Sequence, residues 1–95
     1  MSLPKVSGPT TTVSVDGHLI TVRGLTRGEN AQVSRFIDQK QIEEAEIFIL
    51  GRGTDTADDE AAGWYRDTPN ADVEKVLNAI GDLTRLTEGA AKSGP

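Results

Sequence analysis

Residues 68–86 read TPNADVEKVLNAIGDLTRL, and the predicted fold rests mainly on them. Their apolar residues recur every three or four positions, which is the period of one face of an α-helix. Pro69 suits the first turn of a helix, where its missing N–H costs no hydrogen bond. The stretch therefore predicts an amphipathic helix over about residues 69–87. Its apolar face would carry Val73, Val76, Leu77, Ile80, Leu83 and Leu86.

Three earlier segments also show helical signals. Thr26 precedes Glu29 by three residues, which is the capping-box pattern of a helix start, and predicts a helix over about residues 27–40. Residues 42–50 fit a helix or a buried strand, but their first half holds good helix formers, so a helix is favoured. A short helix is expected over residues 57–66, where acidic residues suit the first turn.

A β-hairpin is predicted over residues 12–23. Asp16 and Gly17 lie between two runs rich in valine, isoleucine and threonine. An Asp-Gly pair tolerates the positive φ angles of a two-residue type I′ turn. Because an isolated hairpin is barely stable in water, we expect this one to lie against the helices or against another chain.

A chain of 95 residues is long enough for one domain. We expect that domain over residues 12–89, between a flexible N-terminal arm at residues 1–11 and a flexible tail at residues 90–95. The expected fold class is mainly α (α+β): a small N-terminal β-hairpin followed by three to four helices in a compact bundle.

Composition narrows the function classes. The chain has no cysteine, which excludes disulfides and cysteine-based zinc sites. Fifteen acidic residues against ten basic ones give a net charge of −5, which disfavours nucleic-acid binding. The sequence shows no apolar run of membrane-spanning length and no secretory signal pattern, so we expect a cytoplasmic protein without membrane association.

Catalytic and ligand-binding motifs are weak. His18 is the only histidine, and we interpret it as an exposed strand residue, because the chain offers it no nucleophile or orienting group. Gly51-Arg52-Gly53-Thr54 lacks the lysine of a P-loop, so a helix stop and hinge is the simpler interpretation. The acidic residues do not match a calcium-binding loop. We therefore expect no enzyme activity, no metal and no cofactor.

Two groups of residues are candidates for binding a protein partner. The first contains large apolar and aromatic residues, for which a core position is the simpler alternative: Phe48, Trp64, Tyr65, Leu83 and Leu86. The second contains carboxylates, for which a solvated helix surface is the simpler alternative to an acidic patch: Glu43, Glu44, Glu46, Asp55, Asp58, Asp59 and Glu60.

Several phrases occur in a familiar order along the chain. They are VRGLTRGE at residues 22–29, a glutamate-containing helix at 43–50 that runs into a glycine, AAGWY at 61–65, and a final helix at 72–86 that ends in IGDLTRL. In this order the chain resembles the small tail assembly chaperones of long-tailed (siphovirus-type) bacteriophages. It departs from that family at residues 54–56, which lack the Asp-Pro that often follows the mid-chain glycine.

This resemblance implies a non-enzymatic function in the host cytoplasm. Such proteins bind the tape-measure protein, keep it soluble, help to recruit tail-tube subunits and are absent from the mature virion. Many also exist in a longer form made by ribosomal frameshifting. Chains this small often gain stability by homo-oligomerisation, which is a further expectation here.

Two other functions remain open from the sequence. Residues 43–74 hold ten acidic residues against Arg52 and Arg66, a net charge of −8, which would suit a small phage inhibitor that mimics nucleic acid and blocks a host nuclease or DNA-binding protein. Alternatively, the hairpin could add a strand to a neighbouring subunit in a minor virion connector or tail protein.

Overall fold

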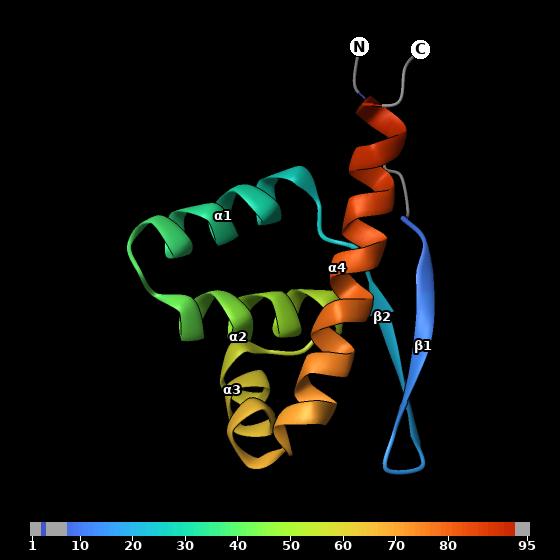
Figure 1. The fold of residues 1–95 in the computed structure, drawn as a ribbon, viewed down its shortest axis with the longest axis vertical. Coiled ribbons are helices and arrows are strands. Elements are labelled where there is room, and N and C mark those ends of the chain that lie inside the picture. The colour runs from blue at the N-terminus through green and yellow to red at the C-terminus, as the bar shows by residue number, and fades with distance from the viewer. Residues whose placement is uncertain (1–2, 4–7, 93–95) are drawn as a thin grey trace.

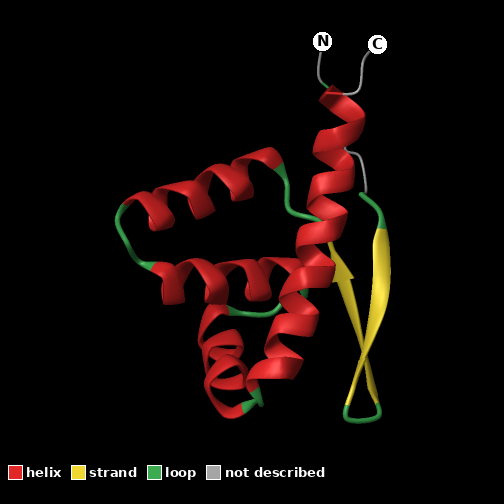
Figure 2. Cartoon of the chain, in the orientation of Figure 1, coloured by secondary structure: helices red, strands yellow, loops and turns green. Residues whose placement is uncertain are grey.

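The computed structural model describes the backbone of residue 3 and residues 8–92, and the side chains of residues 3 and 8–85. The elements are β1 (Thr10–Val15), β2 (His18–Arg23), α1 (Arg27–Asp38), α2 (Ile42–Gly53), α3 (Asp58–Asp67) and α4 (Asn70–Lys92). α4 lies in the middle, with the hairpin on one side and α2 and α3 on the other (Figure 1). α1 packs on α2. The predicted fold class, a hairpin followed by a mainly helical bundle, is confirmed (Figure 2).

The amphipathic face of α4 forms the centre of the core. Val76 and Ile80 are fully buried there, together with Val22 of the hairpin. The helix extends to Lys92. The predicted helix end near residue 87 is therefore wrong, and so is the predicted loose tail over residues 90–92. A single glycine within a helix costs only about 1 kcal/mol, which is why Gly89 does not end it. Residues 93–95 of the predicted tail lie outside the described residues.

The hairpin turn has the predicted geometry. Asp16 and Gly17 have φ angles of 50° and 78°, and β1 and β2 are antiparallel, with Val13 opposite Ile20 and Val15 opposite His18. Val13, Val15 and Val22 point into the core. β1 begins at Thr10, so the predicted arm is shorter than residues 1–11, and most of it, residues 1–2 and 4–7, lies outside the described residues.

The predicted helix stop at Gly51 is wrong. α2 continues through Gly51 to Gly53, and both glycines are buried. A Cβ on Gly53 would lie 2.3 Å from Cδ1 of Ile80, so α2 approaches α4 too closely there for any side chain. Gly53 therefore serves helix packing, and the chain turns only afterwards, at Asp55, whose φ is 54°.

The last residue of β2 anchors the hairpin to two other segments. The guanidinium of Arg23 donates from Nη1 and Nη2 to the two carboxylate oxygens of Glu29, at 2.9 and 3.0 Å, and from Nε to Asp55 at 3.2 Å. Glu29 also completes the predicted capping box with Thr26 at the start of α1. We call these three charged residues the Arg23 junction.

Candidate binding groove

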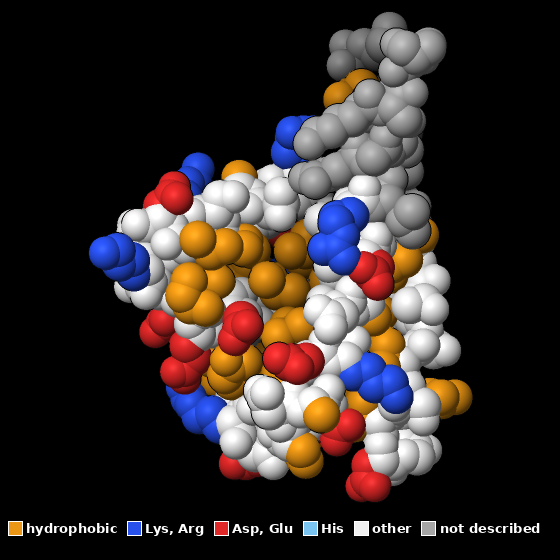
Figure 3. Space-filling view, in the orientation of Figure 1, with side chains coloured by type: hydrophobic (Ala, Val, Ile, Leu, Met, Phe, Trp, Pro, Cys, Tyr) orange, Lys and Arg blue, Asp and Glu red, His pale blue; other side chains and the backbone are white. Residues whose placement is uncertain are grey.

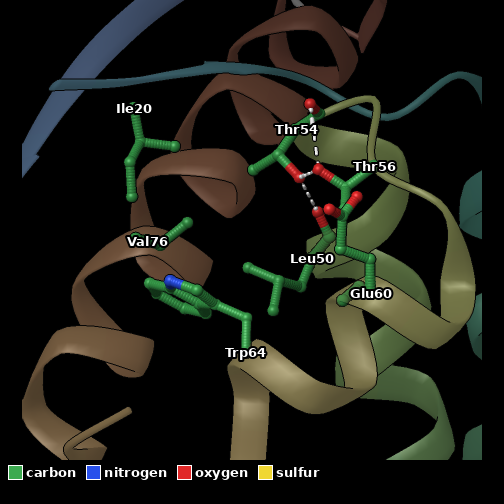
Figure 4. Close-up of a pocket in the computed structure, with 8 residues that line it drawn as sticks. Ile20, Leu50, Thr54, Thr56, Glu60, Trp64 and Val76 are labelled. Atoms are coloured by element: carbon green, nitrogen blue, oxygen red, sulfur yellow. Dashed lines mark hydrogen bonds between the residues drawn. The ribbon is translucent and has the colours of Figure 1, made fainter. Parts of the chain in front are cut away.

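An apolar pocket lies where four elements meet. It has a volume of about 290 Å³, and β2, α2, α3 and α4 all contribute to its wall. Figure 4 shows the side chains of Ile20 and Val76 on one side and Leu50 on the other, with the ring of Trp64 below Val76. We call this the Trp64 pocket; its lining residues are Ile20, Leu50, Thr54, Thr56, Glu60, Ala61, Trp64 and Val76.

The polar part of the pocket wall is already hydrogen-bonded within the protein. The hydroxyl of Thr54 donates to the carbonyl of Leu50 at 2.7 Å, and the hydroxyls of Thr54 and Thr56 are 2.7 Å apart (Figure 4). Glu60 is exposed at the edge. Because the threonine hydroxyls already have partners, the pocket is suited to an apolar group.

A larger, open groove adjoins the Trp64 pocket at the hairpin turn. It has a volume of about 700 Å³ and shares Ile20 and Trp64 with the pocket, so the two form one continuous surface. We call it the turn groove; its lining residues are Val15, Asp16, His18, Ile20, Trp64, Asp67, Thr68, Pro69 and Asp72.

The break between α3 and α4 brings the far wall of this groove into place. Thr68 is extended and ends α3, and its N–H donates to the carbonyl of Trp64 at 3.1 Å. Pro69 cannot continue α3, and its carbonyl accepts the first hydrogen bonds of α4, from the N–H groups of Asp72 and Val73. The reversal therefore places Trp64 and Asp72 at one corner of the molecule.

Trp64 is half-buried and lines both the pocket and the groove, as a partner-binding residue would. Phe48 lies elsewhere. Its ring is 5.8 Å from that of Phe36 in α1, and the guanidinium of Arg52 lies 5.2 Å from its centre. Phe36 and Phe48 are both half-buried and pack against the core, and neither lines the Trp64 pocket or the turn groove. Apolar side chains also gather over α1 and α2 in Figure 3.

Two of the other apolar candidates, Tyr65 and Leu83, contribute to the structure of the protein itself. Tyr65 is half-buried and donates from its hydroxyl to Glu46 in α2 at 2.5 Å. This hydrogen bond to a carboxylate, together with burial, raises the pKa of Tyr65 to about 12. Leu83 is buried in the core rather than on an exposed face. The side chain of Leu86 lies outside the described residues.

The seven predicted acidic residues do not form one uniform patch. Four of them contact another side chain: Glu43 lies 3.6 Å from Arg66, Glu46 accepts from Tyr65, Asp55 contacts Arg23, and Asp58 lies 3.9 Å from Arg52. The remaining three, Glu44, Asp59 and Glu60, are exposed.

Sequence reasoning missed three carboxylates that converge on the turn groove, Asp16, Asp67 and Asp72. Each lies beside a chain reversal that the sequence does predict, either the Asp-Gly turn or the break at Pro69. A position beside a chain reversal could have marked these residues as surface candidates, because residues at turns project from the surface. Which turns meet in space depends on the packing of α4 and cannot be read from the local sequence.

The charged groups of the Arg23 junction hold each other in place and shift each other's pKa values. The two hydrogen bonds from Arg23 hold the pKa of Glu29 at about 2, although partial burial acts in the opposite direction. The same contact raises the pKa of the Arg23 guanidinium. Among the described residues, this guanidinium donates its hydrogen bonds to Glu29, Asp55 and the carbonyl of Gly24, all acceptors of the protein itself. The junction therefore stabilises the fold and does not resemble a ligand site.

The described part of the chain has neither a cluster of metal ligands nor a membrane-spanning helix. No three His, Asp or Glu side chains there lie close enough together to hold a metal ion. No helix in that part is both long and apolar enough to cross a lipid bilayer. His18 is exposed in the turn groove. Comparison with known proteins gives no match to a family model, to a curated protein or to a solved structure.

Proposed function

We propose that this protein is a non-catalytic binding protein that acts as a tail assembly chaperone of a long-tailed bacteriophage. Its client would be the tape-measure protein, which it would keep soluble in the host cytoplasm while helping to recruit tail-tube subunits, and it would be absent from the mature virion. The order of sequence phrases supports the family, and the Trp64 pocket is the observation that carries the binding function.

The size and lining of the Trp64 pocket favour a polypeptide side chain as its occupant. At about 290 Å³ it lies at the small end of ligand pockets, which suits one or two apolar side chains better than a cofactor. Tryptophan is also the residue that most often contributes a large share of the binding energy at protein interfaces.

The arrangement of the walls favours a helical client. The pocket is built by packed elements on a buried core, so little ordering is needed on binding. The turn groove extends it along the surface, so successive apolar residues on one face of a client helix could occupy both. This is the helix-in-groove mode of recognition, which needs no titrating residue.

Co-expression with the tape-measure protein of the phage that encodes this chain tests the proposal. With the wild type, we expect the tape-measure protein in the soluble fraction and co-purification that survives high salt, because apolar contacts are only weakly screened. We expect Trp64→Ala to reduce co-purification at least about tenfold, as loss of an anchor residue does. Leu19→Ala is the matched control, because Leu19 is 74% exposed on the same strand as Ile20 but lines neither surface.

Urea unfolding of both variants shows whether they remain folded. A folded Trp64→Ala variant that keeps the tape-measure protein soluble would contradict the proposal. So would recovery of a basic host protein that salt removes, which is the result expected of a charge-mimicking inhibitor. Mass spectrometry of purified virions adds a third readout, since a connector or tail subunit would be present there.

A further inference from the structure

We infer that the turn groove selects client segments in which lysine or arginine flanks the apolar side chain that enters the Trp64 pocket. This inference rests on the proposed function, because it takes the occupant to be a polypeptide. It adds a recognition rule that an apolar pocket alone does not supply.

The three carboxylates that line the turn groove come from different segments of the chain. Asp16 comes from the hairpin turn, Asp67 from the end of α3 and Asp72 from the first turn of α4. Among the described side chains, none of the three has an ion-pair or hydrogen-bond partner through its carboxylate. Asp55 and Glu43, in contrast, each contact an arginine.

The cations closest in sequence to Asp67 and Asp72 have other partners. Arg66 precedes Asp67 in sequence, but its guanidinium lies 3.6 Å from Glu43 in α2. Lys75 lies one helical turn after Asp72, but its amine donates to the carbonyl of Ser14 at 2.6 Å. Neither cation is among the residues that line the groove, so with His18 counted as neutral the three carboxylates give the lining a formal charge of −3 at pH 7.

Apolar side chains line the turn groove together with these carboxylates. Val15, Ile20, Trp64 and Pro69 line the same groove. An apolar centre with a charged edge is the usual composition of a protein-binding surface. Clefts with one sign of charge and weakly polarisable walls concentrate the electrostatic field, so an occupant with lysine or arginine is favoured and an acidic one is repelled.

Trp64 provides the readout for a test. It is the single tryptophan of the chain and lines both the pocket and the groove. Its fluorescence therefore reports occupation of this surface in the unmodified full chain. Two alanine-rich helical peptides of about 18 residues serve as probes. They share leucines at i, i+3 and i+7 and differ only in the flanking residues, which are lysine in one peptide and glutamine in the other.

We expect the wild type to bind the lysine peptide about tenfold more tightly than the glutamine peptide at low salt, since several partly shielded charge pairs would form. In the variant Asp16→Asn/Asp67→Asn/Asp72→Asn this preference should fall to about twofold or less. Asparagine tolerates the positive φ of residue 16, so the turn is retained. Urea unfolding and the three single substitutions show whether any loss reflects misfolding.

The control variant Asp38→Asn/Glu44→Gln/Glu74→Gln removes the same number of charges from exposed carboxylates outside both surfaces. It should keep the tenfold preference.

Equal loss of this preference in both variants would mean a general charge effect and would overturn the inference. Equal binding of both peptides by the wild type would also overturn it, while leaving apolar anchoring at Trp64, and thus the proposed function, intact. Binding of neither peptide overturns the inference alone, whereas unaltered client solubility with a folded Trp64→Ala overturns the proposed function as well.

Discussion

The two ends of the β-hairpin differ in how their acidic residues are used. At the strand end, Glu29 and Asp55 both contact Arg23, and the N–H of Leu25 donates to the buried hydroxyl of Thr84 in α4 at 2.9 Å. At the turn end, the carboxylates of Asp16, Asp67 and Asp72 have no partner among the described side chains, and Trp64 is half-buried beside them. We call these the closed end and the open end.

This difference separates stability from binding. Contacts at the closed end join segments far apart in sequence: Arg23 holds the end of the hairpin to the segment after α2, and Leu25, just after the hairpin, is held to α4. The open end keeps apolar and charged groups exposed, which contributes little to folding but leaves them available to a partner. Substitutions at the closed end should therefore affect unfolding, and substitutions at the open end should affect binding.

The largest effect is expected at Gly53, two residues before Asp55. Ile80, which a Cβ at Gly53 would meet, is fully buried and has little room to move. Gly53→Ala should therefore lower the free energy of unfolding in urea by about 1–3 kcal/mol, despite the higher helix propensity of alanine.

Gly63→Ala is the matched control for Gly53. Gly63 lies within α3, is exposed and has open space around it. Alanine there should raise the free energy of unfolding by about 0.5–1 kcal/mol through helix propensity alone. Equal effects at the two glycines would show that α2 does not press against α4 as described.

An intermediate effect is expected for Glu29→Gln, which removes the charge from the Arg23 junction. We expect the free energy of unfolding to fall by about 1–2 kcal/mol at neutral pH, after allowing for partial solvent exposure of the pair. The pKa of Glu29 is lowered in the folded state to about 2, from an ordinary value of 4.5. Its stabilising contribution is therefore complete above about pH 4.5 and is lost as the pH falls toward 2.

Urea unfolding of the wild type and Glu29→Gln across this range measures that contribution as a difference. Glu44→Gln is the control, since Glu44 is exposed on α2 and is absent from the ion pairs of the described side chains. A constant difference between the wild type and Glu29→Gln from pH 7 to pH 2.5 would show that Glu29 does not hold Arg23 as a carboxylate.

The smallest effect is expected at the open end. Asp67 lies at the C-terminal end of α3, where a negative charge opposes the helix dipole, and it shares the groove with two other carboxylates. Asp67→Asn should therefore raise the free energy of unfolding by up to about 0.5 kcal/mol while weakening the binding of lysine-rich peptides.

Asp58→Asn is the comparison within the same helix. Asp58 lies in the first turn of α3 and 3.9 Å from Arg52, so neutralising it should slightly lower the free energy of unfolding. If Asp67→Asn instead destabilises the protein more than Asp58→Asn does, Asp67 has a structural role and the distinction between the two ends fails there.

Features set by neighbouring residues could be predicted from the sequence. The Asp-Gly turn fixes the hairpin register, and Thr26 with Glu29 fixes the start of α1, because each depends on residues a few positions apart. The apolar period of α4 likewise predicts the burial of Val73, Val76, Ile80 and Leu83, whereas Leu77 is only half-buried and the buried Thr84 does not follow from that period. These local rules were sufficient for the fold class.

Features set by contacts between distant segments could not be predicted. Gly53 was interpreted as part of a helix stop because the sequence does not show that Ile80 lies against it. The pairing of Arg23 with Asp55 joins residues 32 positions apart, and the acidic wall of the turn groove exists only once α4 packs against the hairpin. Much of the candidate site is therefore a product of tertiary packing.

The position of α4 between the hairpin and α2 also sets an order of events during synthesis. Leu25 and its partner Thr84 are separated by 59 residues, and a ribosome adds about 5–20 residues per second. Thr84 is thus synthesised roughly 3–12 s after Leu25, so the hairpin is complete before the helix that covers its apolar face. Throughout that interval the nascent chain displays an uncovered strand pair, and it is during translation that this protein is most exposed to aggregation and proteolysis.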